Sequence, residues 1–284
     1  MQSLWMIAAS FLFACMGVCV KLAGQYFSAA EIVFYRSAVA LVLMFALVRL
    51  RGIPIATPNW RFQLWRGASG FVSLLLYFYA ISMLPLATAV TLSYTSPLFL
   101  TLYLVWFGKM RLRVAMFGAL ALGFAGVVLL LRPTFHAEQL LGGCIGLASG
   151  MLAGIAYFNV KEQGERGELE ERTVFYFSLL SAAGSGAWMT LFEFHRVTPY
   201  GALLLFGVGG LGTAAQLAMT RAYKRGRTLM AASLAYSTVI FASLFGVLFW
   251  HERLSVGAWL AIVLIVASGV AATFFSRASP AEQD

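Results

Sequence analysis

Long apolar segments, separated by short charged or Pro/Gly-containing breaks, occupy almost the whole of this chain. A helix of roughly 20 apolar residues crosses the hydrocarbon core of a bilayer and satisfies every backbone N–H and C=O within its own segment. The candidate segments are 4–23, 30–48, 67–83, 87–107, 114–131, 141–160, 173–192, 200–219, 229–249 and 256–275. We therefore expect an all-α integral membrane protein with ten transmembrane helices. Because only a short break at Pro85 separates the third and fourth segments, nine or eleven spans remain alternatives.

Composition leaves little material for a water-soluble domain. Hydrophobic residues make up 61% of the 284 residues and charged residues 11%, whereas soluble domains carry about 25% charged residues. The first apolar segment is not preceded by a cationic region, so we expect a retained helix and not a cleaved signal peptide.

The positive charge of the chain is distributed unevenly between the two sides of the predicted membrane. Numbering the loops alternately from the N-terminus places fifteen of the twenty Lys and Arg residues, Arg66 among them, on the N-terminal side. Because positively charged loops stay in the cytoplasm, both termini are predicted to be cytoplasmic. The net charge of +9 thus reflects topology in a lipid bilayer and does not indicate a nucleic-acid partner.

Similar sequences recur at a fixed spacing along the chain. V-F-Y-R-S at 33–37 resembles V-F-Y-F-S at 174–178, and at a shift of 142 the segment 86–94 aligns with 228–236. The same shift pairs Gly70 with Gly212. The pattern predicts two homologous halves, residues 1–135 and 136–284, with five helices each.

An odd number of helices in each half has a topological consequence. The second half must enter the membrane from the opposite side, so the two halves would be inverted repeats. Inverted repeats are typical of secondary transporters, which bind substrate near the midplane and alternate access by rocking.

Several residues resemble one transporter family in their order along the chain. They are Lys21 closing the first span, Arg36 early in the second, Y-T-S-P-L-F at 94–99 in the fourth and H-E-R-L at 251–254 closing the ninth. With the ten-span layout, they resemble the EamA type of the drug/metabolite transporter superfamily over nearly the whole chain. Two departures are Val239, where the family often has Pro, and Met110, where the counterpart of Glu252 would be expected.

Among the subgroups of that family, the chain most resembles the YddG-like exporters of aromatic amino acids. The resemblance implies a multi-pass protein of a bacterial-type inner membrane that exports amino acids, aromatic ones included, or similar zwitterionic metabolites. Export of amphipathic drugs or other metabolites is the alternative. An intramembrane enzyme is a distant alternative.

Two polar stripes related by the repeat are the first candidate substrate contacts. Thr91, Tyr94 and Thr95 share a face of the fourth span at helical spacing. The ninth span carries the repeat partners of this stripe, Ser233, Tyr236 and Ser237. The alternative is helix packing, because Ser and Thr commonly join membrane helices.

Further polar and aromatic residues extend the candidate site. They are Tyr77 and Tyr79 in the third span, Tyr157 and Asn159 in the sixth and Gln216 in the eighth. Aromatic rings stack on aromatic substrates and attract ammonium groups, so a ring-lined cavity suits a zwitterion. A place in the interfacial aromatic belt is the alternative for any single tyrosine.

Arg36 is the one cation predicted to lie well inside a span, roughly 9 Å from its start at 1.5 Å per residue. Such a charge is costly and could bind a substrate carboxylate, or it could snorkel to the interface. All eleven acidic residues fall in tails, loops or span ends. Since proton-coupled carriers often place a carboxylate within the membrane, we expect facilitated transport, with coupling through a group that the sequence does not identify as the alternative.

Other patterns carry no chemistry. G-V-G-G-L-G at 207–212 matches a dinucleotide motif but lies inside a span, where close helix packing explains it. His136, His195 and His251 lack metal-ligand spacing, and the three cysteines are expected to be packing residues. We therefore expect no cofactor, no metal and no enzymatic activity. The charged stretch 161–172 is expected to be a solvated loop, and the sequence leaves the oligomeric state open.

Overall fold

The computed structural model describes residues 2–84, 86–107, 114–131, 140–189, 194–251 and 255–277, and all regular secondary structure in these ranges is helical. A short 3-10 helix, η1 (Gln2–Leu4), precedes the first α-helix. The α-helices are α1 (Trp5–Ala23), α2 (Ala29–Leu50), α3 (Trp60–Met83), α4 (Leu86–Ser93), α5 (Ser96–Trp106), α6 (Val114–Leu131), α7 (Leu140–Glu165), α8 (Glu170–Met189), α9 (Pro199–Arg225), α10 (Thr228–Ala235), α11 (Ser237–Trp250) and α12 (Val256–Arg277).

The helices follow the predicted apolar segments, and most are long enough to cross a membrane. By length and composition, six segments qualify: Gln2–Ala23, Ala30–Leu50, Ala89–Trp106, Leu140–Glu165, Pro199–Arg225 and Thr228–Phe249. Val114–Leu129 and Val256–Ala272 are shorter apolar helices. The two remaining helices, α3 and α8, carry charged and polar residues in their first two turns, of which Gln63, Arg66, Glu170 and Thr173 are buried. The chain is therefore a multi-pass membrane protein.

The fourth and ninth predicted spans are broken in the middle, where the sequence pattern predicted continuous helices. The first break separates α4 from α5, and the second lies at Tyr236 between α10 and α11. Pro97 in the first turn of α5 has no N–H to donate to a carbonyl of the preceding turn, so the helix is interrupted there. At the second break the Ser237 hydroxyl donates to Leu234 O at 2.6 Å and the Thr238 hydroxyl to Ala235 O at 2.9 Å. Such bonds compete with the helix ladder and bend it.

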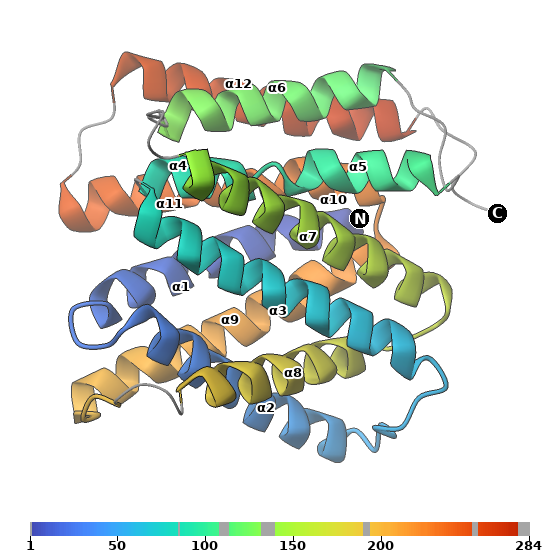
Figure 1. Cartoon of the computed structure of the whole chain (residues 1–284). Helices are drawn as coiled ribbons and strands as arrows, with labels where there is room; N and C mark the ends of the chain where they lie inside the picture. Colours follow the sequence, from blue (N-terminus) through green and yellow to red (C-terminus); the bar gives the residue numbers. More distant parts are fainter. Residues whose placement is uncertain are drawn as a thin grey trace.

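Helices from the N-terminal and C-terminal parts of the chain lie side by side (Figure 1). α3 packs against α7, α1 against α9, α2 against α8 and α6 against α12. The α6 and α12 pair forms one edge of the bundle and the α2 and α8 pair the opposite edge. α1 begins and α12 ends at the same end of the bundle, as expected for an even number of membrane crossings.

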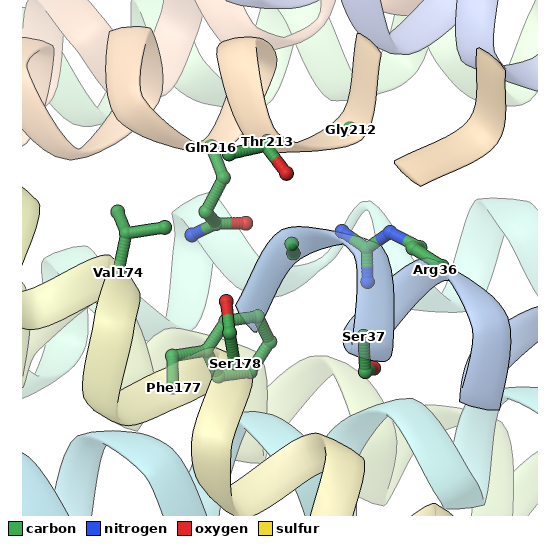
Figure 2. A pocket seen from close by; sticks show the side chains of 9 residues that line it. Arg36, Ser37, Val174, Phe177, Ser178, Gly212, Thr213 and Gln216 are labelled. Carbon is green, nitrogen blue, oxygen red and sulfur yellow. The ribbon is translucent and has the colours of Figure 1, made fainter. Parts of the chain in front are cut away.

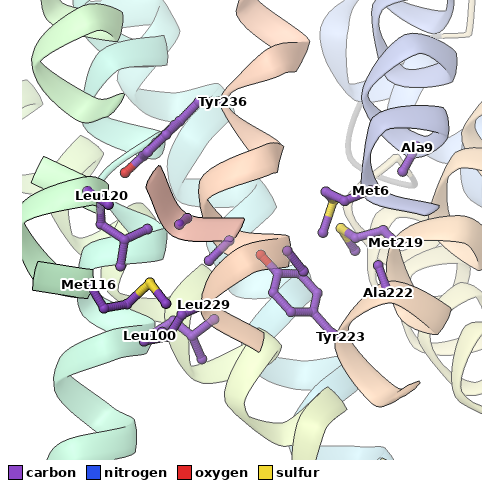
Figure 3. Close-up of a cluster of buried hydrophobic side chains, with 14 of the residues drawn as sticks. Met6, Ala9, Leu100, Met116, Leu120, Met219, Ala222, Tyr223, Leu229 and Tyr236 are labelled. Carbon is purple, nitrogen blue, oxygen red and sulfur yellow. The ribbon is translucent and has the colours of Figure 1, made fainter. Parts of the chain in front are cut away.

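The largest apolar cluster joins the broken helices to α1, α6 and α9 (Figure 3). Its buried side chains include Met6, Leu100, Met116, Leu120, Met219, Tyr223, Leu229 and Tyr236. Tyr236 can lie against α6 because residue 123 is glycine: a Cβ there would approach its ring carbon Cδ2 to 2.6 Å. Because lipid tails are as apolar as these side chains, close packing and not the exclusion of water holds this cluster together.

Candidate functional site

A cavity of about 410 Å³ lies between α1, α2, α3, α7, α8 and α9. Val20 of α1 and Ile32 of α2 line it near the turn at residues 24–28, and Arg66 of α3 and Met219 of α9 line it deeper in the bundle. Its other lining residues are Phe13, Met16, Gly17, Val33, Arg36, Gly70, Ser73, Leu74, Tyr77, Ser93, Ala153, Ala156, Tyr157, Phe177 and Gln216. This volume is in the range of small-molecule sites.

Arg36 and Arg66 bring two guanidinium groups to the wall of this cavity. Arg66 is only 2% exposed. Arg36 Nε and Arg66 Nε and Nη1 are buried without a hydrogen-bond partner among the described residues. Within those residues, neither guanidinium forms an ion pair, and none of the described residues that line the cavity is acidic. The cavity wall therefore carries an excess of positive charge.

Aromatic and glycine residues hold the Arg66 side chain in place. Its guanidinium carbon lies 4.5 Å from the centre of the Phe177 ring, a cation–π arrangement. Gly70 leaves room for the guanidinium here, because a Cβ at that position would displace Arg66 Nη1 and lie 3.0 Å from Phe177 Cε2. Gly212 gives similar room to Arg36, whose Nε would lie 3.1 Å from a Cβ at that position.

A narrow recess between α2, α8 and α9 adjoins the cavity and shares Arg36, Phe177 and Gln216 with it (Figure 2). Gln216 extends from α9 toward Phe177 and Ser178 of α8. Its amide Nε2 is buried without a hydrogen-bond partner among the described residues. Hence the buried, unpartnered side-chain atoms that line the cavity are donor nitrogens of Arg36, Arg66 and Gln216.

Tyr157 and Tyr77 supply the aromatic part of the wall. The Tyr157 ring stacks on Tyr223 with centroids 5.0 Å apart and planes 18° apart, which fixes its orientation toward the cavity. Four residues singled out from the sequence thus meet at this cavity: Arg36, Tyr77, Tyr157 and Gln216.

The two predicted polar stripes lie beside the cavity at the breaks of the broken helices. Tyr94 and Tyr236 contact each other with ring centroids 6.2 Å apart, and Tyr236 is fully buried in the apolar cluster. Neither tyrosine is among the lining residues. The helix breaks interrupt the spacing on which each stripe was predicted to share one face.

The hydroxyl groups of these stripes make short-range contacts. Ser233 and Ser268 share a hydrogen bond of 2.7 Å, which joins α10 to α12. Thr95 donates to Leu92 O at 2.5 Å and Ser237 to Leu234 O at 2.6 Å, both within the broken spans. Thr91 is buried in α4. Of these contacts, only the Ser233–Ser268 bond joins two spans, as the helix-packing interpretation expects.

Asn159 and Tyr79 lie outside the cavity. Asn159 donates to Ile155 O at 3.0 Å within α7. It also lines a separate groove of about 490 Å³ with Trp65, Tyr103, Trp106, Phe107, Ile155 and Phe158. Tyr79 is exposed on the outside of α3, where a bilayer-facing position is expected for a tyrosine near a helix end.

Arg66 is a cavity residue that the sequence analysis assigned to a loop. The third span was predicted to begin at residue 67, but α3 begins at Trp60 and places Arg66 inside the helix. The signal that could have found it is the spacing of Arg66, Gly70, Ser73 and Tyr77, which recur at i, i+4, i+7 and i+11 and all line the cavity. This stripe escapes prediction from the sequence when each apolar segment is ended at a charged residue, because the third span then begins after Arg66.

A buried carboxylate and the side chains that donate hydrogen bonds to it close the end of the bundle opposite the α1–α2 turn. Glu168, in the connection between α7 and α8, accepts hydrogen bonds from the Thr57 hydroxyl, from Asn59 Nδ2 at 2.9 Å, from Gln63 Nε2 at 3.0 Å and from Arg172 Nη1 at 3.0 Å. We call these five residues the Glu168 cluster. Burial raises the pKa of Glu168, but the hydrogen bonds outweigh it and hold the pKa below its ordinary value.

The same connection is tied to α9 by two further cations. Lys224 donates to Glu168 O at 3.0 Å, to Leu169 O at 3.1 Å and to the Thr173 hydroxyl at 2.6 Å. Arg225 pairs with Glu170, with Nε and Oε1 2.5 Å apart. The prediction of a solvated loop at 161–172 was therefore wrong, because residues 161–165 extend α7, residues 170–172 begin α8, and both helix ends pack against α3 and α9.

At the other end, Glu31 joins α2 to the segment that precedes α9. Glu31 is fully buried and closes a capping box with Ser28 at the start of α2. It also accepts a hydrogen bond from His195 N at 2.6 Å, and its Oε2 lies 2.8 Å from His195 Nδ1. His195 is thus engaged with a carboxylate, and no group of three or more potential metal ligands gathers in the described residues. His136, Pro85 and residues 252–254 of the H-E-R-L motif lie outside the described ranges.

Comparison with known proteins gives consistent matches over the whole length. The EamA-like transporter family matches residues 1–132 and residues 140–274. The pseudopaline exporter CntI of Pseudomonas aeruginosa is 31% identical over 87% of this chain and 86% of its own length. An uncharacterized transporter of Helicobacter pylori is 25% identical over 93% and 91%, and mouse solute carrier family 35 member G1 is 24% identical over 87% and 71%.

A crystal structure shares the arrangement of the helices. It superposes with a TM-score of 0.86 over 97% of both chains, at 21% sequence identity. At this identity the likeness establishes the fold alone.

Proposed function

Since the chain belongs to the EamA-like transporter family, we propose that it is a secondary transporter that exports amino acids, aromatic ones included, or similar small metabolites across a bacterial inner membrane. The observation that carries this proposal is the cavity of about 410 Å³, in which Arg36 and Arg66 face aromatic walls. A guanidinium binds the carboxylate of an amino acid, and Tyr77 and Tyr157 offer rings to its side chain and ammonium group. The Pseudomonas relative is named a pseudopaline exporter.

The pairing of the helices supports an inverted repeat. If the five spans of the first half correspond in order to those of the second, α1 corresponds to α7 and α3 to α9. The packing of α3 against α7 then has its counterpart in the packing of α9 against α1. In the same way, the packing of α2 against α9 has its counterpart in the packing of α8 against α3. α2 with α8 and α6 with α12 are their own counterparts. We propose that residues 1–135 and 136–284 are these two halves, and that they rock against each other during transport.

The position of the cavity suggests the access state of this conformation. The cavity extends from the side of the α1–α2 turn into the bundle, and the Glu168 cluster closes the opposite end. The distribution of Lys and Arg favours a cytoplasmic position for that closed end and for both termini. We infer that the cavity opens away from the cytoplasm here, and that the Glu168 cluster must separate to admit substrate from the cytoplasm.

We propose that transport is facilitative. Proton-driven carriers often hold a carboxylate within the substrate path, and the described residues that line this cavity are not acidic. Arg36, Tyr77, Tyr157 and Gln216, with Arg66, would contact the substrate. Tyr94 and Tyr236 and the hydroxyls beside them would border the path at the helix breaks when the halves rearrange.

A second candidate function is export of amphipathic drugs or related metabolites. It is favoured by the separate groove of about 490 Å³, in which Trp65, Trp106 and Phe158 accompany the polar Asn159. A mainly apolar groove with a few polar groups suits an amphipathic molecule that arrives from the lipid.

The proposal is tested by uptake of radiolabelled phenylalanine, glutamine and glutamate into proteoliposomes without an imposed pH gradient, with empty liposomes as the control. We expect saturable uptake of at least one amino acid that excess unlabelled compound blocks. Arg36→Met should abolish it, whereas Arg196→Met, in an exposed segment before α9, should not. Absence of uptake by folded protein for all three compounds would leave the amphipathic-drug function, which an uptake assay with a cationic dye then tests.

A further inference from the structure

The cavity wall carries two positive charges, Arg66 buried and Arg36 partly buried, for which the described chain supplies no counter-charge. Arg36 and Arg66 come from different helices, α2 and α3, and both line the cavity without an ion pair among the described residues. A buried charge without a partner is strongly unfavourable. Elsewhere the same protein pairs its buried charges, as Glu168 with Arg172 at 3.0 Å and Glu170 with Arg225 at 2.5 Å show.

The side chain of Arg66 is also fixed where it lies. Stacking on Phe177 at 4.5 Å and the close approach of Gly70 leave its Nε and Nη1 buried and without a partner. Gln216 adds a third unpartnered donor on the opposite wall, from α9. Donors in excess of acceptors call for a ligand that is rich in acceptors.

We propose that this cavity recognises a small organic anion with two carboxylates, one held by Arg36 and the other by Arg66. The inference rests on the proposed function, in which the cavity is the transport site, and it specifies the substrate class more narrowly. A single carboxylate would leave one guanidinium buried and uncompensated. Two carboxylates on one carbon skeleton neutralise both, and each can accept two parallel N–H bonds from a guanidinium.

The walls between the two arginines favour an organic anion over an inorganic one. Phe13, Leu74, Tyr77 and Phe177 present apolar and aromatic surface to the cavity. Such surface stabilises a carbon skeleton, whereas a phosphate ion would meet it unfavourably. The preferred ligand is thus an acidic amino-acid derivative or a dicarboxylic acid, a narrower class than the amino acids and similar small metabolites proposed above.

The test measures ligand-induced stabilisation of the purified full-length protein. The unfolding temperature is recorded against increasing concentrations of the dianions succinate, glutarate and adipate, and of the singly charged butyrate, valerate and hexanoate. At least one dianion is expected to stabilise the protein at about 10-fold or more lower concentration than its singly charged counterpart, since a charged hydrogen bond contributes about 1.5–3 kcal/mol and 1.4 kcal/mol is tenfold.

Variants locate the effect. Arg36→Met and Arg66→Met should each abolish the preference for the dianion, and Arg66→Gln serves if Arg66→Met does not fold. Arg61→Met is the matched control, because Arg61 lies one turn earlier in α3, is exposed and stacks on Trp60; it should keep the preference. Equal potency of dianions and monoanions, a preference that survives both arginine variants, or stabilisation by inorganic phosphate alone would overturn the proposal.

The outcomes for this inference and for the proposed function can be told apart. Phenylalanine uptake into proteoliposomes without any preference for dianions would overturn the inference and leave the amino-acid exporter intact. A clear preference for a dianion in the binding assay, with no uptake of that dianion into proteoliposomes, would support the binding site and contradict the transport function.

Discussion

Two groups of buried charges lie at different depths in this bundle, and they are built in opposite ways. In the Glu168 cluster, one carboxylate accepts hydrogen bonds from four side chains that belong to the α2–α3 connection, α3 and α8. At the cavity, Arg36 and Arg66 have no such partners in the described chain. Removing one member of a paired set leaves a charge uncompensated, whereas removing an unpaired charge removes a cost. We therefore expect the first group to stabilise the fold, and we propose that the second serves a ligand.

The largest effect is expected from Glu168→Ala. The substitution removes the acceptor of four hydrogen bonds and leaves Arg172 without its carboxylate, so we expect a loss of about 3–5 kcal/mol in the free energy of unfolding. Denaturation of the purified protein in mixed micelles measures it. Glu165→Ala is the control, because Glu165 is half exposed and pairs with Lys161, and an exposed pair contributes about 1 kcal/mol or less. Equal losses in the two variants would contradict the special role of Glu168.

Arg66→Met should shift stability in the opposite direction while impairing transport. Methionine fills a similar volume without a charge, so we expect ligand-free protein to gain up to about 3 kcal/mol, the cost of an arginine within a membrane span. Saturable amino-acid uptake into proteoliposomes should fall at least tenfold. A variant that unfolds more easily than the wild type would show that Arg66 stabilises the fold. The cavity arginines would then not differ from the Glu168 cluster in their role.

The pH dependence of stability offers a third, smaller test. The hydrogen bonds lower the pKa of Glu168 in the folded protein below its ordinary value of 4.5. This contribution to stability is therefore fully present above the unfolded-state pKa and is lost as the pH falls through the folded-state pKa. The unfolding free energy of the wild type should drop more steeply below pH 4.5 than that of Glu168→Gln. Parallel curves for the two proteins would assign the acid sensitivity to other groups.

The bounds of the helices show what the sequence could predict and what it could not. Apolar periodicity and charge predicted the α6 segment 114–131 with the same bounds as the structure. The same criterion cut α3 short at residue 67, because it treats Arg61, Gln63 and Arg66 as loop residues. Arg61 is exposed, but Gln63 and Arg66 are buried within the bundle, where residues distant in the chain surround them: Glu168 accepts from Gln63, and Phe177 stacks on Arg66.

Of the two helix breaks, one could have been predicted from the sequence and the other could not. Pro97 was visible in the sequence and could have predicted the break before α5. The break at Tyr236 has no proline at the corresponding position, Val239, and depends on the hydroxyls of Ser237 and Thr238 bonding to backbone carbonyls. Ser and Thr occur in many continuous membrane helices, so their presence alone does not predict a break.

The smallest effects are expected when a single tyrosine hydroxyl is removed, from Tyr236 at the helix break or from Tyr157 at the cavity. The Tyr236 hydroxyl is buried without a hydrogen-bond partner among the described residues, so Tyr236→Phe should leave stability unchanged or raise it by about 1 kcal/mol. Uptake should remain at the wild-type rate. Tyr157→Phe removes a hydroxyl from the cavity wall, and uptake should fall about 3- to 10-fold if that hydroxyl bonds the substrate, since a neutral hydrogen bond contributes about 0.5–1.5 kcal/mol. The reverse order, with slow uptake only in Tyr236→Phe, would place the substrate at the broken helices, as the polar stripes of the sequence predict, and would reduce the arginine-lined cavity to a vestibule.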